Sequence, residues 1–138
     1  MKKLLLLTSL TVMGYTAQAQ TPAATPAPET PTQLVQRQLE AYNAHDVTRF
    51  AATYAENAEV LQFPAKVQLT GRTKLQEVYG RMFSATPALH CELVHRTVLG
   101  NRILDHERIT GLPNGKVLEA VVIYEVENGL IRRATVIP

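Results

Sequence analysis

The chain has 138 residues, of which 46% are hydrophobic, and carries 14 Lys and Arg against 12 Asp and Glu. This length and composition fit one domain with an ordinary apolar core. Two basic residues, Lys2 and Lys3, fall in a predicted leader, and the remaining chain has a formal charge of 12 − 12 = 0. We therefore exclude nucleic acid as the expected partner, because binding to phosphates needs a basic surface.

Residues 1–19 have the pattern of a secretory signal peptide. Lys2 and Lys3 precede a short apolar run from Leu4 to Val12, and Ala17-Gln18-Ala19 fits the small-x-small cleavage pattern. The apolar run is well short of the roughly 20 residues that a membrane-spanning helix needs. We expect export to the periplasm or the extracellular medium, with no membrane attachment after cleavage.

Residues 20–30 are rich in Pro, Ala and Thr, which is typical of a stiff, extended linker. They separate the leader from one predicted domain at residues 31–138. The single cysteine, Cys91, cannot form an internal disulfide. It is either a packed free thiol or the partner of a second chain, and no neighbouring residue indicates an activated nucleophile.

Three helices are predicted in the first half of this domain. Thr30 can cap the first helix, with Pro31 at its first position and Gln33 completing a capping box, and the helix ends near His45. Asp46 can cap a second, shorter helix with the apolar face Val47, Phe50 and Tyr54. The third helix has the clearest apolar periodicity, formed by Leu75, Val78, Tyr79, Met82 and Phe83.

Turn signals divide the other segments into strands. A short hairpin is expected from residues 58–63 and 67–69, and four longer strands from residues 93–99, 103–110, 117–126 and 130–137. Three dipeptides between the longer strands tolerate positive φ angles: Gly100-Asn101, Asn114-Gly115 and Asn128-Gly129. We expect an α+β fold in which a curved antiparallel sheet, a four-strand meander plus the short hairpin, is wrapped by three helices to form a cone with a pocket.

Two-residue turns would fix the register of the four longer strands. One row across the sheet then reads Arg96, Asp105, Tyr124 and Arg133, with Glu107 in the next row on the same face. This face is mainly apolar and should point into the pocket. The outer face would carry a smaller apolar patch, which we expect to form a homodimer contact: Leu93, Val121, Ile123, Ala134 and Val136.

The domain contains characteristic segments at Ala41–Asp46, Tyr54–Ala58, Gly71, Ile103–Gly111 and Ile123–Ile131. In this order they resemble the SnoaL-like branch of the nuclear-transport-factor-2-like superfamily, over about the whole of residues 31–137. The resemblance implies a cone-shaped fold and a dimer through the outer face of the sheet. It says little of function, because the superfamily includes isomerases, polyketide cyclases, dehydratases and transport factors.

The ketosteroid isomerases of this superfamily use a Tyr on the first helix and an Asp base at the end of the first strand. Aligning this chain with that pattern places Gln38 at the position of the Tyr and Gln62 at the position of the Asp. Glutamine has no useful acid or base capacity near neutral pH. The resemblance therefore does not imply the standard ketosteroid isomerase chemistry.

Asp105 and Glu107 are the candidate catalytic residues, because both should face the pocket from one strand. A carboxyl group in an apolar cavity can have a raised pKa and serve as a general acid or base. The alternative is structural, since Asp105 lies opposite Arg96 and a cross-strand ion pair would neutralise a buried carboxylate. Both interpretations remain open from the sequence.

Other polar side chains could bind a ligand in the pocket. Tyr124 is the strongest of these candidates, because the predicted register surrounds it with acidic and basic groups. Tyr42 and Tyr79 lie at helical spacing among apolar residues, so that they either line the pocket or belong to the core. The full set of ligand-binding candidates is Arg96, Tyr124, Arg133, Gln38, Tyr42, Gln62 and Tyr79.

No metal or cofactor is expected. His95 and His106 should face each other, but their row continues with Ile123, and a metal site usually needs three or four ligands. The chain also lacks a Gly-rich phosphate loop, a nucleophile elbow, a paired-Cys site and a dinucleotide fingerprint.

We expect an exported protein whose pocket binds a small, partly apolar molecule. If it is an enzyme, the reaction would be a cofactor-free proton transfer at carbon, such as isomerisation, cyclisation or dehydration. The alternative is a non-catalytic, homodimeric module that binds a ligand or another protein.

Overall fold

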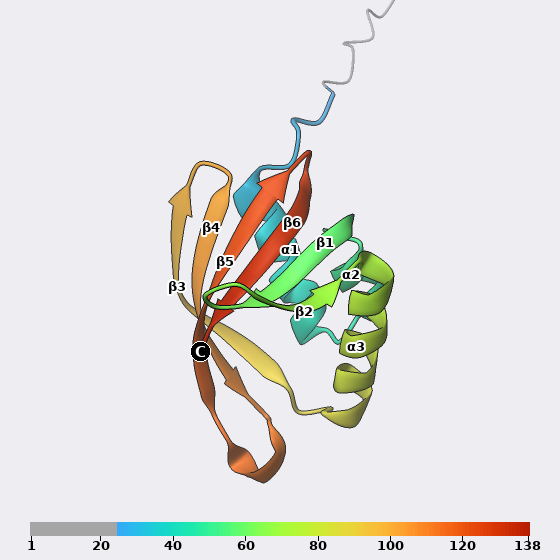
Figure 1. Ribbon diagram of the computed structural model, residues 1–138, viewed down its shortest axis with the longest axis vertical. Helices are drawn as coiled ribbons and strands as arrows, with labels where there is room; N and C mark the ends of the chain where they lie inside the picture. The colour runs from blue at the N-terminus through green and yellow to red at the C-terminus, as the bar shows by residue number, and fades with distance from the viewer. Residues whose placement is uncertain (1–24) are drawn as a thin grey trace, which may run out of the picture.

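The computed structural model describes residues 25–138. The predicted signal peptide and the start of the linker lie outside the described residues, so export stays a prediction. Residues 25–30 form an extended, exposed segment that leads into the first helix (Figure 1). Across the described range, no helix combines the length and apolar character that a membrane span requires.

Helix α1 (Pro31–Asn43) begins where the sequence predicts. The Gln33 amide donates to the Thr30 hydroxyl over 3.2 Å, and the Thr30 amide donates to the Gln33 side chain over 2.9 Å, which completes the capping box. The Leu34 and Val35 side chains are buried. The cap therefore fixes where the helix starts, and the apolar face fixes how it lies on the sheet.

Helix α2 (Val47–Ala51) is capped by Asp46 as predicted, but it is shorter than the sequence indicates. The expectation that its face includes Tyr54 is wrong, because Tyr54 is the first residue of strand β1 (Tyr54–Gln62). Helix α3 (Arg72–Ala85) follows strand β2 (Lys66–Thr70) and buries Leu75 and Phe83. The helical spacing of Val47, Phe50 and Tyr54 therefore extends by coincidence beyond α2 into strand β1.

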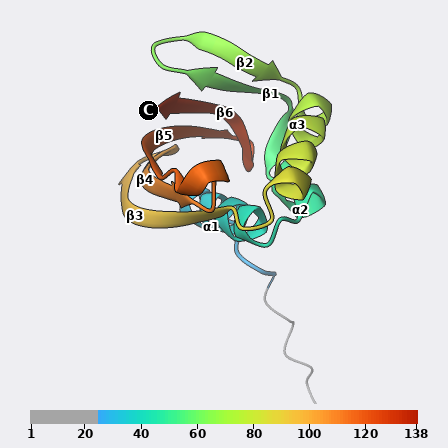
Figure 2. The same cartoon turned by 90° about the horizontal axis from the view of Figure 1, so that it is seen from below.

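Six strands form one sheet in the order β2-β1-β6-β5-β4-β3. The other four strands are β3 (His90–Leu99), β4 (Arg102–Thr110), β5 (Leu118–Glu127) and β6 (Leu130–Ile137). Neighbours pair antiparallel except β1 and β6, which are parallel. The sheet is therefore mixed, and the prediction of a wholly antiparallel sheet is wrong at this pair. The sheet is curved, and α1 and α3 lie on its concave side (Figure 2).

The β4–β5 connection differs from the predicted two-residue turn. A short 3-10 helix, η1 (Pro113–Gly115), occupies the Asn114-Gly115 position, and the strands begin to pair only at Ile109 and Leu118. Asp105 therefore pairs with Val122 instead of Tyr124. Because the register shifts by two residues, every side chain of β5 keeps its predicted face.

The β5–β6 pair contains an irregularity at Glu125 and Val126, beyond which Arg133 pairs with Glu125 and Ala134 with Tyr124. A one-residue shift exchanges the two faces of a strand. The predicted row is therefore wrong at its last member, because Arg133 faces outward while Ala134 shares the inner face with Tyr124.

One-residue shifts of this kind also change which residues belong to the predicted dimer patch. Ala134 and Val136 line the internal cavity, and an irregularity in β3 pairs Leu93 with inward-facing Glu107. Leu93, Ala134 and Val136 therefore do not belong to the outer face. Val121 and Ile123 remain there and are half-buried. A homodimer through this face stays a prediction, with a smaller patch than the sequence indicated.

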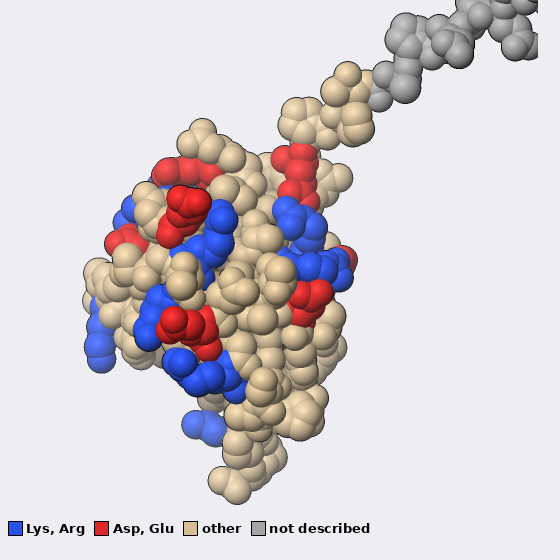
Figure 3. All heavy atoms as spheres, turned by 90° about the vertical axis from the view of Figure 1, so that its right-hand side faces the viewer, with Lys and Arg blue, Asp and Glu red and all other residues tan. Residues whose placement is uncertain are grey.

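Acidic and basic side chains lie mixed on the face shown in Figure 3. Charged side chains of the sheet also form ion pairs across strands, including Arg133 with Glu59 at 3.0 Å and Arg102 with Glu125 at 3.2 Å. At a distance from the surface, the electrostatic fields of adjacent opposite charges largely cancel. This face therefore offers no continuous basic surface.

An aromatic cluster joins the helices to the start of the sheet. The ring centroids of neighbouring members lie 4.5–6.4 Å apart, within the range of favourable aromatic contacts. Phe50 lies at its centre and is fully buried. The cluster comprises Tyr42, Phe50, Tyr54, Tyr79 and Phe83.

The Gly111→Ala change tests a close approach between two segments that flank the sheet. Gly111 has φ +74°, and a Cβ at this position would overlap the carbonyl group of Ala88. Gly115 has a similar φ of +68° but open space around it. We expect Gly115→Ala to lower the free energy of unfolding by about 1–2 kcal/mol. Gly111→Ala should cost roughly 1–3 kcal/mol more, because neighbouring backbone must move.

Urea unfolding of both variants measures this difference. Equal losses for Gly111→Ala and Gly115→Ala would show that backbone conformation alone, and not the contact with Ala88, requires glycine.

Candidate functional site

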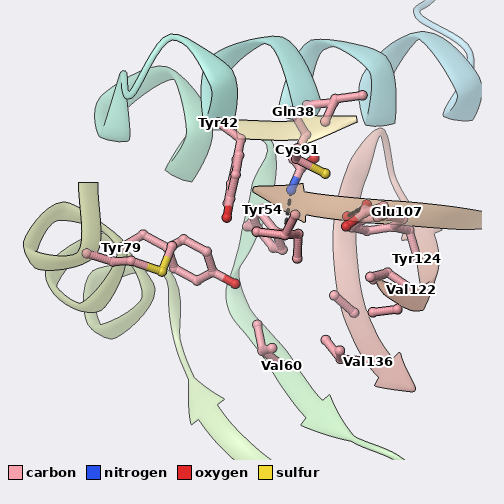
Figure 4. Close-up of a pocket in the computed structure, with 15 residues that line it drawn as sticks. Gln38, Tyr42, Tyr54, Val60, Tyr79, Cys91, Glu107, Val122, Tyr124 and Val136 are labelled. Atoms are coloured by element: carbon pink, nitrogen blue, oxygen red, sulfur yellow. Dashed lines mark hydrogen bonds between the residues drawn. The ribbon is translucent and has the colours of Figure 1, made fainter. Parts of the chain in front are cut away.

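A cavity of about 230 Å³ lies between the inner face of the sheet and helices α1 and α3 (Figure 4). Engineered apolar cavities of about 150 Å³ hold benzene, so this volume suits a molecule of one to two small rings. Its lining is mainly apolar with a few polar groups: Gln38, Leu39, Tyr42, Tyr54, Val60, Tyr79, Met82, Cys91, Glu107, Ile109, Ala120, Val122, Tyr124, Ala134 and Val136.

Glu107 is the carboxyl group in the wall of this cavity. Strand β4 presents it inward, and its side chain is almost fully buried. The Tyr124 hydroxyl donates to Glu107 Oε1 over 2.9 Å. Burial raises the pKa of Glu107, and the charge of Asp105 acts in the same direction, whereas the hydrogen bond from Tyr124 and the charge of Arg96 act against it. Glu107 is thus a buried carboxyl group in the cavity wall with a pKa above its ordinary value.

Asp105 has a different environment, although it lies two residues away on the same strand. Arg96 Nε and Nη2 donate to the two Asp105 carboxylate oxygens, each over 2.7 Å. Arg96 Nη1 also donates to Gln36 on α1 over 3.1 Å. Asp105 is fully buried and does not line the cavity. The geometry is that of a structural ion pair which links α1, β3 and β4.

Gln38 and Tyr54 form a second polar contact in the cavity wall. The Gln38 side-chain amide donates to the Tyr54 hydroxyl over 3.1 Å. Sequence reasoning placed Gln38 among the ligand-binding candidates but missed Tyr54, because it was assigned to a helix face. Ala58 and Val60 alternate as buried positions of β1, but the exposed Glu56 interrupts this alternation before Tyr54, so the pattern did not reveal it.

The cavity brings together five of the predicted site residues: Glu107, Tyr124, Gln38, Tyr42 and Tyr79. Arg96 and Asp105 face the interior but pair with each other outside the lining. Arg133 lies on the outer face beside Glu59 and Glu125. Gln62 is exposed at the end of β1 and accepts a hydrogen bond from Gln68 over 3.4 Å. The expected positions of Arg133 and Gln62 in the pocket are therefore wrong.

Cys91 is a cavity residue that the sequence did not indicate. It pairs with Ile109 at the inner face of the sheet, and its thiol is buried beside Glu107. Burial raises the pKa of the Cys91 thiol, and the nearby carboxyl groups add to this effect. The thiol is therefore neutral and is not activated as a nucleophile.

His95 and His106 pair across β3 and β4, as the register predicts. The His106 ring lies 3.3 Å from a Glu119 carboxylate oxygen on the outer face. Within residues 25–138, no group of three or more His, Cys, Asp or Glu side chains is arranged to hold a metal ion.

A family model described as a SnoaL-like domain matches residues 35–134. The chain therefore belongs to the SnoaL-like family, which confirms that part of the resemblance. No curated protein matches the chain by sequence.

Three solved structures illustrate the shared fold. A cystatin-fold protein from Novosphingobium aromaticivorans is 21% identical, with a TM-score of 0.75 over 80% of this chain and 99% of that chain. A proposed polyketide cyclase from Sinorhizobium meliloti is 19% identical, with a TM-score of 0.65 over 75% of this chain and 92% of that chain. A proposed ketosteroid isomerase from Kribbella flavida is 21% identical, with a TM-score of 0.66 over 78% of this chain and 76% of that chain. At these identities the likeness shows the fold alone.

The Arg96→Met change tests whether the Arg96–Asp105 pair is structural. The substitution keeps an apolar stem but leaves the Asp105 carboxylate buried without its partner, so we expect a loss of about 3–5 kcal/mol in the free energy of unfolding. The double change Arg96→Met with Asp105→Leu removes both charges and should recover most of that loss.

Lys74→Met provides the matched control for the loss of a cation. It breaks the exposed Lys74–Glu77 pair, which spans 3.1 Å, and should cost under about 1 kcal/mol. Chemical unfolding of the variants checks these values. If Arg96→Met cost no more than Lys74→Met, Arg96 would not stabilise the fold.

The raised pKa of Glu107 predicts how the free energy of unfolding changes with pH. Above its ordinary value of 4.5 the unfolded chain releases this proton while the folded chain keeps it, so the folded state binds more protons. The free energy of unfolding of the wild type should therefore fall relative to Glu107→Gln as the pH rises from about 4.5 through the raised pKa, and then level off.

Urea unfolding of both proteins between about pH 4 and pH 8 measures this difference. Because the remaining titratable groups are common to both proteins, their contributions largely cancel. A difference that stays constant, or that rises in favour of the wild type, would contradict the raised pKa.

Proposed function

We propose that this cavity binds a small, largely apolar molecule and that Glu107 transfers a proton to or from one of its carbon atoms without a cofactor. The proposal rests on one observation: a buried carboxyl group lies in the wall of an apolar cavity and accepts a hydrogen bond from Tyr124. A positioned carboxyl group can serve as the general acid or base of an isomerisation, cyclisation or dehydration at carbon.

Glu107 suits this role better than Asp105, because the two carboxyl groups have different partners. Both oxygens of Asp105 are bound by Arg96, so that a proton there would break a buried ion pair. Glu107 has Tyr124 on one oxygen and borders the cavity. The Tyr124 hydroxyl holds the carboxyl group in place, and the Cys91 thiol lies beside the same carboxyl group.

The proposed step is simple for a substrate with a carbonyl group. The C–H bond next to the carbonyl breaks, the proton passes to the Glu107 carboxylate, and the electron pair moves to the carbonyl oxygen to give an enolate. Return of a proton to the same or another carbon completes an exchange or an isomerisation. The apolar wall excludes water, which strengthens the electrostatic contacts that guide this transfer.

Hydrogen–deuterium exchange of 2-tetralone in deuterated water tests the proposal. This bicyclic ketone matches the cavity in size and has acidic hydrogens next to its carbonyl. NMR spectroscopy would follow loss of these hydrogens with wild-type protein and with Glu107→Gln. We expect the substitution to slow the protein-dependent exchange by about 100-fold or more, the usual contribution of a general base.

Glu119→Gln is the matched control, because it makes the same chemical change on the outer face. The Glu119→Gln variant should promote the exchange of 2-tetralone hydrogens at the wild-type rate. Equal exchange by wild type and Glu107→Gln would overturn the assignment of Glu107. Binding of 2-tetralone without any protein-dependent exchange would instead favour the non-catalytic binding module.

A further inference from the structure

Two tyrosine hydroxyls in the cavity have no protein partner among the hydrogen bonds of residues 25–138. They belong to Tyr42 on α1 and Tyr79 on α3, and Figure 4 shows both oxygens directed into the cavity. The other two tyrosines of the lining are engaged, since Tyr54 accepts from Gln38 and Tyr124 donates to Glu107. Both side chains are half-buried and line the cavity, so the pair offers two hydroxyl groups to a ligand oxygen.

Aromatic packing fixes the positions of these two rings. Tyr42 packs edge-on against Phe83 at a centroid distance of 5.3 Å, and Tyr79 packs against Phe50 at 4.5 Å. The Tyr42 and Tyr79 rings also contact each other edge-on at 6.4 Å. Because each ring is held by its neighbours, little side-chain freedom would be lost when a ligand binds.

The charge of the cavity restricts the ligand class. None of its lining residues is Lys, Arg or His, and the nearby Arg96 is bound to Asp105. An anionic ligand would be buried without a counter-charge, at a large cost. Burial raises the pKa of Tyr79 to about 12 and also raises the pKa of Tyr42, so both hydroxyls stay protonated and can donate at neutral pH.

We infer that Tyr42 and Tyr79 together recognise a neutral carbonyl oxygen, and hence that the ligand is an uncharged cyclic ketone or a similar carbonyl compound. A carbonyl oxygen has two lone pairs and can accept from both hydroxyls. Glu107 completes the lining on strand β4, so a ligand held by the tyrosines would place its ring portion toward the carboxyl group. The inference rests on the proposed function of this cavity and adds the class of ligand that the cavity recognises.

The test compares two probes of the same shape that differ in one oxygen. 2-Tetralone carries the carbonyl group, and tetralin is the parent hydrocarbon. NMR titration would measure the affinity of each probe for wild type, Tyr42→Phe, Tyr79→Phe and the double variant. Each substitution should weaken 2-tetralone binding about twofold to tenfold, which is the usual worth of a neutral hydrogen bond, and leave tetralin binding unchanged.

The same titration separates the possible failures. Equal weakening of both probes would mean that the tyrosines only shape the cavity, and no weakening of either would mean that they do not contact the ligand. Either result overturns the inference while the cavity remains a binding site. If the wild type bound neither probe, the proposed function would fail together with the inference. Tight binding of tetralin-2-carboxylate would overturn the restriction to uncharged ligands.

Discussion

The bidentate ion pair between Arg96 and Asp105 is the contact on which the rest of the site depends. It neutralises a fully buried carboxylate and, through Gln36, ties the first helix to the edge of the sheet. Arg96 binds Asp105 there, whereas Glu107 faces the cavity with the Tyr124 phenol and the Cys91 thiol as its neighbours. Strand β4 thus carries two buried acids with different partners, of which only Glu107 lines the cavity.

The sheet and the helices contribute different parts of the cavity wall. The sheet curves, and its inner face supplies small or branched residues such as Ala120, Val122 and Ala134. The aromatic cluster packs α1 against α3 beside the cavity. A mainly apolar cavity with a few polar groups is the usual form of a small-molecule site. Membership of the SnoaL-like family agrees with this arrangement but leaves its chemistry to the side chains.

Local sequence signals predicted much of the fold. The capping box at Thr30, the cap at Asp46 and the tight turns at Gly100 and Asn128 occur as expected, because each depends on interactions within a few residues. The sequence also predicted that Glu107 and Tyr124 share one face, since a shift of two residues preserves the alternation of a strand. Five candidate ligand or catalytic residues consequently meet in one cavity.

What the sequence determined by itself was the set of elements and the alternating faces of most strands. Only the tertiary structure decided the parallel pairing of β1 with β6, the irregularities that turn Arg133 outward and Leu93 inward, and the separate partners of Asp105 and Glu107. The physical reason is that these features depend on contacts between residues far apart in the chain. A shift of a single residue exchanges the faces of a strand at little local cost, so no short-range pattern reveals it.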